Sequence, residues 1–105
     1  MVTKLKDAQP KEFKGISFDV LAIGEKSMVT KMNYKEGDYA PAHSHPNEQS
    51  GYVISGKYIL IIGGSEELIT AGDSYVIPGN VPHSVKVIEA GAIIDVFTPV
   101  REDYL

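Results

Sequence analysis

The three histidines of this chain are its clearest chemical signal, because two share the run His43-Ser44-His45 and the third, His83, follows a turn with two prolines. Residues two apart on a β-strand point to the same face, so the imidazoles of His43 and His45 would lie side by side. Neighbouring imidazoles bind Zn, Ni, Fe, Mn or Cu. A histidine pair is a weak signal alone, and a lone His83 is more often a core or surface residue. The placement of all three beside turns strengthens the metal hypothesis.

The residues alone leave open which oxygen ligand would complete such a site. Glu48 and Gln49 are adjacent, so on a strand they point to opposite faces. A carboxylate binds cations more tightly than an amide, which favours Glu48, whereas Gln49 can point back toward the histidines. Three imidazoles and one oxygen would leave positions open for water or substrate, as in catalytic metal sites.

A second chemical signal is Asp95, which stands among apolar neighbours in residues 93–97. If residues 88–93 form a hairpin turn, Asp95 falls opposite His83 on the paired strand and Phe97 lies beside it. A solvated strand carboxylate is the alternative, but the apolar neighbours favour a buried Asp95. A buried carboxylate near a metal can act as a general acid or base.

The elements that must position these groups are short β-strands, because no window keeps a 3.6-residue apolar period for three turns. About eight strands with turn signals roughly every 8 to 12 residues predict a β-sandwich or small barrel. Residues 6–13 carry either a strand or one helical turn, and the polar tail 101–105 is expected to pack along the outside. The strands are expected at residues 27–34, 39–45, 49–55, 57–63, 66–73, 74–78, 83–89 and 92–98.

Length and composition limit the class of protein. A chain of 105 residues fits one domain. A net charge of −4 with scattered basic residues argues against a nucleic-acid partner. The lack of cysteine excludes disulfides and thiolate ligands. The sequence shows no apolar leader core and no apolar run of membrane length, so we expect a cytoplasmic protein without a membrane partner.

The spacing of the first histidine pair resembles the first motif of the cupin superfamily. That motif starts at Gly37, continues through His43 and His45, and ends at Gly56. Gln49 takes the position of the usual glutamate, a replacement found among small cupins. The resemblance therefore makes Gln49, rather than its neighbour, the expected ligand.

The region around the third histidine resembles the second cupin motif. Gly72, Pro78 and His83 match its spacing. Two departures occur: Gly79-Asn80 stands in swapped order, which leaves the turn geometry open, and Val87 replaces the usual asparagine, which is not a metal ligand.

The resemblance implies one all-β domain over residues 1–105, with its core at about 26–100, folded as the double-stranded β-helix (jelly roll) of RmlC-like cupins. It implies one divalent metal ion in the barrel mouth, with Zn, Ni, Fe and Mn all suitable. Cupins of this size usually form homodimers that cover strand edges. The apolar residues on both faces of 51–55 and 57–63 suit burial on both sides. The implied metal ligands are His43, His45, Gln49 and His83.

KdgF-type cupins, which are pectin degradation proteins that ketonise uronates, resemble this chain further through the turn HSHxNEQ and through Asp95, Phe97 and Arg101 at the right spacing. The resemblance implies a metal-dependent isomerase or lyase of carbohydrate metabolism that converts a cyclic 4,5-unsaturated, carboxylate-bearing sugar into its linear keto form. Asp95 would move the proton, Arg101 would pair with the substrate carboxylate and Phe97 would shape the pocket. A surface arginine paired with Glu102 or Asp103 is the alternative.

Two other functions suit the same ligands. A cupin dioxygenase-type oxidoreductase would use Fe, Ni or Cu with the same three imidazoles and one oxygen. A non-enzymatic, metal-bearing module would bind a sugar or an anion. The lack of an attached DNA-binding segment argues against a complete transcription factor, but it leaves a sensor open.

Overall fold

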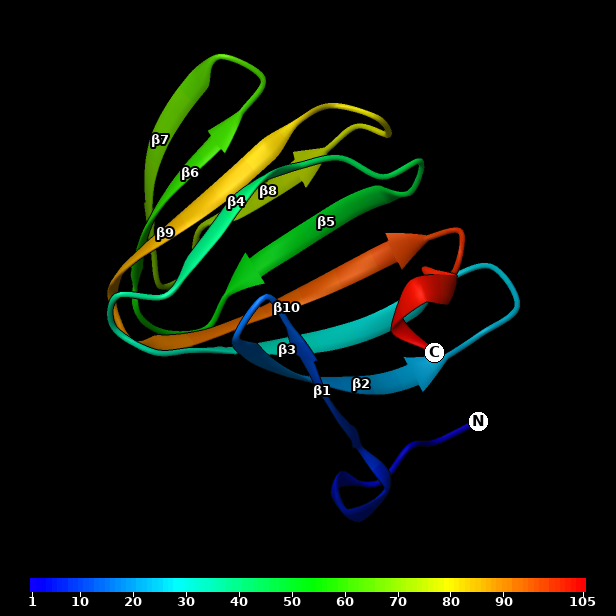
Figure 1. Ribbon diagram of the computed structural model, residues 1–105. Helices are drawn as coiled ribbons and strands as arrows, with labels where there is room; N and C mark the ends of the chain where they lie inside the picture. The colour runs from blue at the N-terminus through cyan, green and yellow to red at the C-terminus, as the bar shows by residue number, and fades with distance from the viewer.

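The computed structural model describes residues 1–105 as two antiparallel β-sheets that face each other (Figure 1). The strands are β1 (Gln9–Phe13), β2 (Ile16–Ile23), β3 (Met28–Tyr34), β4 (Tyr39–His43), β5 (Glu48–Val53), β6 (Lys57–Ile62), β7 (Ser65–Thr70), β8 (Ser74–Ile77), β9 (His83–Glu89) and β10 (Gly91–Thr98). One sheet has the order β1-β2-β3-β10-β5-β8 and the other β4-β9-β6-β7. The predicted all-β jelly roll is confirmed.

Two short 3-10 helices flank the strands, η1 (Leu5–Asp7) before β1 and η2 (Glu102–Tyr104) after β10. Neither has the length or the apolar character that a membrane-crossing helix needs. Figure 1 shows η2 at the end of the barrel where β10 finishes. Its position matters below because this is also the end that holds the histidines.

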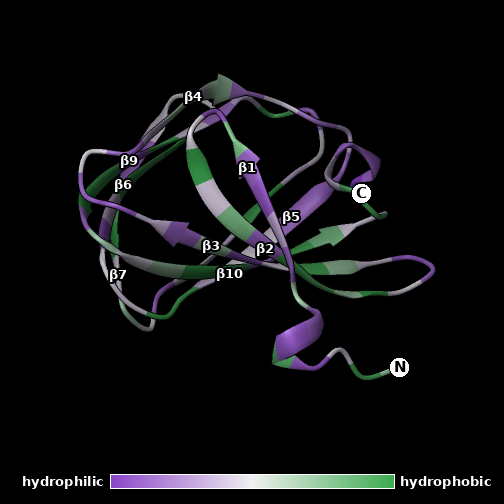
Figure 2. Ribbon diagram, turned by 60° about the horizontal axis from the view of Figure 1, so that its bottom comes forward, coloured by the Kyte–Doolittle hydropathy of each residue, from purple (hydrophilic) through white to green (hydrophobic).

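Strand β3 illustrates why this sequence forms a sheet. Met28, Thr30, Met32 and Tyr34 are buried, and the residues between them are partly exposed, as the predicted alternation requires. Hydrophobic and hydrophilic bands alternate in the same way along β2 in Figure 2. The inner faces of the two sheets together bury a core of 17 hydrophobic residues, which fixes the frame of the site.

The N-terminal part of the chain contains more structure than the sequence predicted. Residues 6–13 contribute both a helical turn and a strand, and residues 16–23, where no strand was expected, form β2. Ile16, Phe18 and Val20 are buried on one face of β2. The count therefore rises from about eight strands to ten, since β1 and β2 extend the larger sheet beyond β3.

The predicted hairpin at residues 88–93 is wrong. β9 lies in the four-stranded sheet, whereas β10 crosses to the six-stranded sheet and pairs with β3 and β5. Asp95 is therefore not opposite His83; its register partners are Thr30 and Gly51. The turn at 90–91 joins two sheets instead of two paired strands, because β6 and β4 already occupy both edges of β9.

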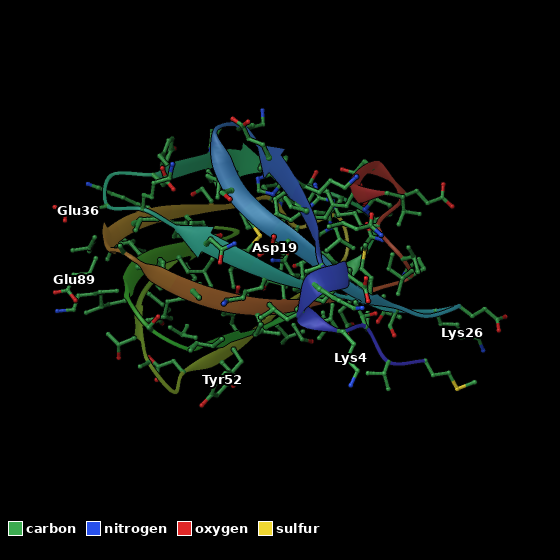
Figure 3. All side chains as sticks on the ribbon, turned by 90° about the horizontal axis from the view of Figure 1, so that it is seen from below. Lys4, Asp19, Lys26, Glu36, Tyr52 and Glu89 are labelled. Carbon is green, nitrogen blue, oxygen red and sulfur yellow. The ribbon has the colours of Figure 1, made fainter.

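One further expectation about the surface is wrong. The tail 101–105 does not lie along the outside, because the side chains of Arg101 and Tyr104 are buried. The expected burial of β5 on both sides belongs with the expected dimer and stays a prediction: in the single chain Val53 is buried, whereas Tyr52 is 53% exposed. Figure 3 shows Tyr52 pointing away from the barrel. Strand alternation, rather than apolar content, decides which of these residues is inside.

Candidate metal and active site

The three histidines converge at one end of the barrel. His43 ends β4, His83 begins β9, and the two are register partners in the four-stranded sheet. His45 lies two residues beyond β4, in the turn that leads to β5. The ring centroids of His43 and His83 are 4.3 Å apart, and those of His45 and His83 are 4.9 Å apart. One ring nitrogen from each histidine lies within 4.8 Å of the others, so the three form a group that could hold a metal ion.

The backbone fixes the tautomer of all three rings. Each Nδ1 lies within hydrogen-bond distance of a backbone carbonyl, which can only accept, so each Nδ1 carries the proton and donates it. The Nε2 atoms are then left with free lone pairs, the arrangement typical of metal-binding histidines. The three contacts are His43 Nδ1 to the Pro41 oxygen at 2.9 Å, His45 Nδ1 to the Asn47 oxygen at 3.0 Å, and His83 Nδ1 to the Val81 oxygen at 2.9 Å.

Two of these Nε2 lone pairs have no protein donor to bind, which is what a cation site requires. The Nε2 atom of His83 is buried and has no hydrogen-bond partner, which is costly unless something binds it. The Nε2 atom of His45 lies 3.1 Å from Oε1 of Gln49, so two acceptors face each other. A positive ion between such groups would satisfy all of them, and we conclude that the donor set suits a divalent metal.

Burial keeps the imidazoles in the form that binds metals. It lowers the pKa of His83 to about 4, with the backbone hydrogen bond to Val81 opposing the shift. It also lowers the pKa of His43 and of His45. Neutral imidazole, not imidazolium, is the metal ligand, so at neutral pH these three rings need not lose a proton before binding.

The structure turns Gln49 inward and Glu48 outward. Gln49 is 8% exposed and faces His45, whereas Glu48, one residue earlier on β5, is exposed. The amide of Gln49 therefore stands where the fourth protein ligand would be. The carboxylate of Glu48, the stronger cation ligand by chemistry alone, cannot reach the histidines from the opposite face.

Asp95 lies inside the barrel although the predicted reason for its position was wrong. The side chain is 2% exposed, and its Oδ1 accepts a hydrogen bond of 2.6 Å from the hydroxyl of Tyr75 on β8. Burial raises the pKa of Asp95 to about 6, against the opposing effects of hydrogen bonds from Tyr75 and Gln49 and of the Arg101 charge. A carboxyl group with this pKa is suited to exchange a proton near neutral pH.

Tyr75 was not singled out from the sequence, because its contact with Asp95 joins strands 20 residues apart. The only local signal is Gly51, which faces both Tyr75 and Asp95 in the sheet register. A glycine inside a strand often marks a close approach by another group, and here that group is the tyrosine ring.

Arg101 and Phe97 line the same cavity inside the barrel as Asp95. The Phe97 ring packs edge-on to His45, with centroids 5.6 Å apart. Arg101 is 5% exposed; its Nε donates to Asp103 at 3.1 Å, and its Nη1 donates to the Tyr104 hydroxyl at 2.8 Å. The guanidinium also covers the Tyr104 ring at 4.0 Å. Arg101 therefore pairs with Asp103, as the alternative to substrate binding predicted, but it does so from a buried position and not from the surface.

Two hollows meet at Arg101. The inner cavity is lined by His43, His83, Gln49 and Asp95 and has a volume of about 30 Å³, which is room for one or two water molecules or an ion. An open hollow of about 460 Å³ lies outside it, lined by His45 and Arg101 among other polar residues. The outer hollow has the size of a small-molecule site, and the inner cavity does not.

Comparison with known families agrees with this geometry. The cupin domain family matches residues 30–97, which include every candidate ligand and Asp95. The chain belongs to the cupin family. As a cupin it has the expected motifs, and Asn80, part of the swapped Gly79-Asn80 pair, adopts a left-handed backbone with φ of 64° that keeps the turn before His83 tight.

Two kinds of curated protein resemble this cupin. It is 29% identical over 93 residues to the pectin degradation protein KdgF of Dickeya dadantii (strain 3937). That match covers 87% of this chain and 84% of KdgF. It is 39% identical over 94 residues to the HTH-type transcriptional regulator PuuR of Escherichia coli (strain K12). That match covers 82% of this cupin but only 50% of the regulator, so the chain spans half the length of that relative.

Solved structures agree on the fold. An RmlC-like cupin from Shewanella frigidimarina NCIMB 400 superposes with a TM-score of 0.91 at 27% identity, covering 99% of this cupin and 95% of that chain. KdgF from Halomonas sp. superposes with a TM-score of 0.90 at 24% identity, covering 100% and 98%. The second likeness shows the fold alone.

Proposed function

We propose that this cupin is a metal-dependent isomerase or lyase that acts on a small carbohydrate acid, with a 4,5-unsaturated uronate as the substrate class. The observation that carries the proposal is the position of Asp95: a buried carboxylate with a pKa near 6 shares one small cavity with His43 and His83, two of the three converging imidazoles. The similarity to the pectin degradation protein KdgF supports the choice of substrate.

The proposed ligands of one divalent ion are His43, His45, His83 and Gln49. Three neutral imidazoles and one amide oxygen add no negative charge, so the bound ion would keep its full charge toward the substrate. When bound, the metal would supply the positive charge that stabilises a developing enolate oxygen. The donor types suit Zn, Ni, Fe and Mn alike.

Arg101 is proposed to bind the substrate carboxylate at the inner wall of the outer hollow. Its planar guanidinium already holds the carboxylate of Asp103 through Nε, with both carboxylate oxygens at 3.1 Å. A substrate carboxylate would replace Asp103 there and direct the rest of the sugar toward His45. Phe97, which packs between Arg101 and His45, would close the apolar side of the pocket.

Asp95 is proposed to move the proton. In the ring-opening isomerisation, the anomeric hydroxyl loses its proton, the bond between the anomeric carbon and the ring oxygen breaks, and the released enolate takes a proton at C4 to become the ketone. The formula of the sugar does not change, so no co-reactant is needed. A carboxyl group with a pKa near 6 can donate the proton to C4 and be protonated again by the proton from the anomeric hydroxyl.

The test is the loss of ultraviolet absorbance of the C4–C5 double bond when metal-loaded protein is mixed with an unsaturated uronate. We expect Asp95→Asn to abolish turnover even at a metal concentration that saturates the variant, and Glu48→Gln, which changes an exposed carboxylate on β5, to leave turnover unchanged. Turnover that survives Asp95→Asn would contradict the assignment of the proton carrier. Oxygen uptake with a candidate substrate would point to an oxidoreductase instead.

A second candidate function is a binding module that senses a small carboxylate or sugar without turning it over. The observation that favours it is the 39% identity to half of a transcriptional regulator. Calorimetric titration together with the ultraviolet absorbance of the uronate separates the two functions. A module binds the uronate and leaves its double bond intact, whereas the enzyme removes the double bond.

We also propose that the cupin forms a homodimer through the outer face of its six-stranded sheet. Tyr52, Ile54 and Val76, on or next to strands β5 and β8, are exposed large apolar side chains near the free edge of that sheet. Sedimentation of the wild type and of a Tyr52→Glu variant tests the idea. A wild-type monomer at micromolar concentration would contradict it.

A further inference from the structure

Four inner-face residues form a row across the six-stranded sheet: Thr30 on β3, Asp95 on β10, Gly51 on β5 and Tyr75 on β8. Tyr75 and Asp95 are separated by the whole width of β5, yet the Tyr75 hydroxyl donates to Asp95 at 2.6 Å. The tyrosine side chain therefore lies flat over Gly51 to reach its acceptor.

Gly51 is what makes that contact possible. A Cβ atom at this position would overlap the end of the Tyr75 ring and its hydroxyl. The backbone of Gly51 does not need the left-handed conformation that usually explains a glycine. The residue is thus matched to Tyr75 by space alone, and a methyl group here would push the tyrosine away from Asp95.

Gln49 connects this pair with the histidines. It precedes Gly51 by two residues on β5, so both point to the inner face. Its Oε1 faces Nε2 of His45 at 3.1 Å, and its side chain lines the inner cavity together with Tyr75 and Asp95. The Gln49 amide also lowers the pKa of Asp95, which only its NH₂ end can do. Because an ionised carboxylate can only accept, the NH₂ end of the amide must face Asp95, which leaves the oxygen end for the histidines.

We propose that Tyr75 is a positioning residue that, through Asp95, fixes the Gln49 amide with its oxygen turned toward the three imidazoles. The inference rests on the metal-binding part of the proposed function and is independent of the uronate reaction. It also accounts for the glutamine at a position where cupins usually carry glutamate: a carboxylate there would meet Asp95 without a hydrogen to share. An amide offers one end to each neighbour.

The test measures the metal itself. Purified protein is stripped with a chelator and titrated with Co²⁺, whose visible absorption reports its ligands, and Zn²⁺ affinity follows by competition. We expect Tyr75→Phe, which removes only the hydroxyl, to weaken binding about ten-fold, as loss of a group that orients a metal ligand typically does. Gly51→Ala should weaken it similarly, because it displaces the same ring without removing any polar atom. Both variants should change the Co²⁺ spectrum.

The deciding comparison uses the Gln49→Ala background. If Tyr75 acts through the glutamine, Tyr75→Phe should cause no further loss of affinity once Gln49 is gone. The inference is overturned if Tyr75→Phe leaves affinity and spectrum unchanged while Gln49→Ala alters them, or if its full effect persists without Gln49. Thermal unfolding of each stripped variant shows that the fold is retained. A protein that binds Co²⁺ as expected but leaves the uronate intact would refute the proposed reaction and not this inference.

Discussion

Replacing Asp95 by asparagine should make the metal-free protein more stable while it removes the proposed proton carrier. Burial raises the pKa of Asp95 from 3.8 to about 6, so the folded state holds this proton more tightly than the unfolded chain. The stability that protonation contributes is present below pH about 4 and is lost as the pH rises through about 6. A difference of about two pH units corresponds to about 3 kcal/mol, which is the cost of ionised Asp95 at pH 7.

Asparagine is the right substitute because it keeps the shape and most contacts. The Tyr75 hydroxyl can still donate to the amide oxygen of Asn at position 95. The new NH₂ group needs an acceptor, and Thr30, the register partner on β3, has a buried Oγ1 without a hydrogen-bond partner. The substitution therefore removes the charge without leaving a new donor unpaired.

The assay is urea unfolding of chelator-treated wild type and variant between pH 4 and pH 8. We expect the variant's advantage to be near zero at pH 4 and to grow to about 3 kcal/mol at pH 7. The histidines, whose pKa values are lowered, destabilise the fold as the pH falls, but both proteins carry them and their effect cancels in the difference. Glu48→Gln, which removes an exposed carboxylate, is the matched control. A variant less stable than wild type at pH 7, with a difference that does not change with pH, would refute the reasoning.

Three further predictions address the metal, the mouth of the site and the fold. Zn²⁺ at a thousand times its dissociation constant should stabilise the protein by about 4 kcal/mol, seen as a higher melting temperature, and His83→Ala should remove that rise. Arg101→Lys should raise KM for a uronate about ten-fold with a smaller change in kcat, because a point charge cannot replace the planar fork. Gly56→Ala should cost more than about 1 kcal/mol in thermal unfolding, since Gly56 has φ of +94° and its Cβ would lie 2.8 Å from the Glu89 carbonyl oxygen, whereas Gly64→Ala, in open space, should cost little.

The parts of the fold that the sequence predicted depend on local regularities. Alternating side chains identified β3, and motif spacing identified the jelly roll. The same alternation explains why Gln49 and Glu48 lie on opposite faces. Asp95 was expected to be buried because its neighbours are apolar, and it is buried. The predicted pairing of Asp95 with His83 was wrong.

The parts that were missed depend on contacts between distant segments. A tight turn that reverses a strand within one sheet and a turn that carries the chain to the other sheet look alike locally, so the crossing from β9 to β10 was not predictable. Tyr75 reaches Asp95 only because Gly51 lies between them in the register. The inward position of Arg101 and Tyr104 depends on aromatic partners such as Phe18, whose ring centroid lies 4.4 Å from that of Tyr104. Phe18 precedes Tyr104 by more than eighty residues in the sequence.

If Arg101 binds the substrate carboxylate as proposed, its ion pair with Asp103 has a consequence for selectivity. Asp103 is a tethered competitor: it sits on the same polypeptide as the guanidinium, so it is present at a high effective concentration however dilute the protein is. Its side chain is 61% exposed, so the pair is worth at most about 1 kcal/mol. A simple carboxylate such as acetate, with one point of attachment, gains little by displacing it. A ligand that also places oxygens near the histidines would gain a second attachment and displace Asp103, so the tail would select ligands by the number of points at which they bind.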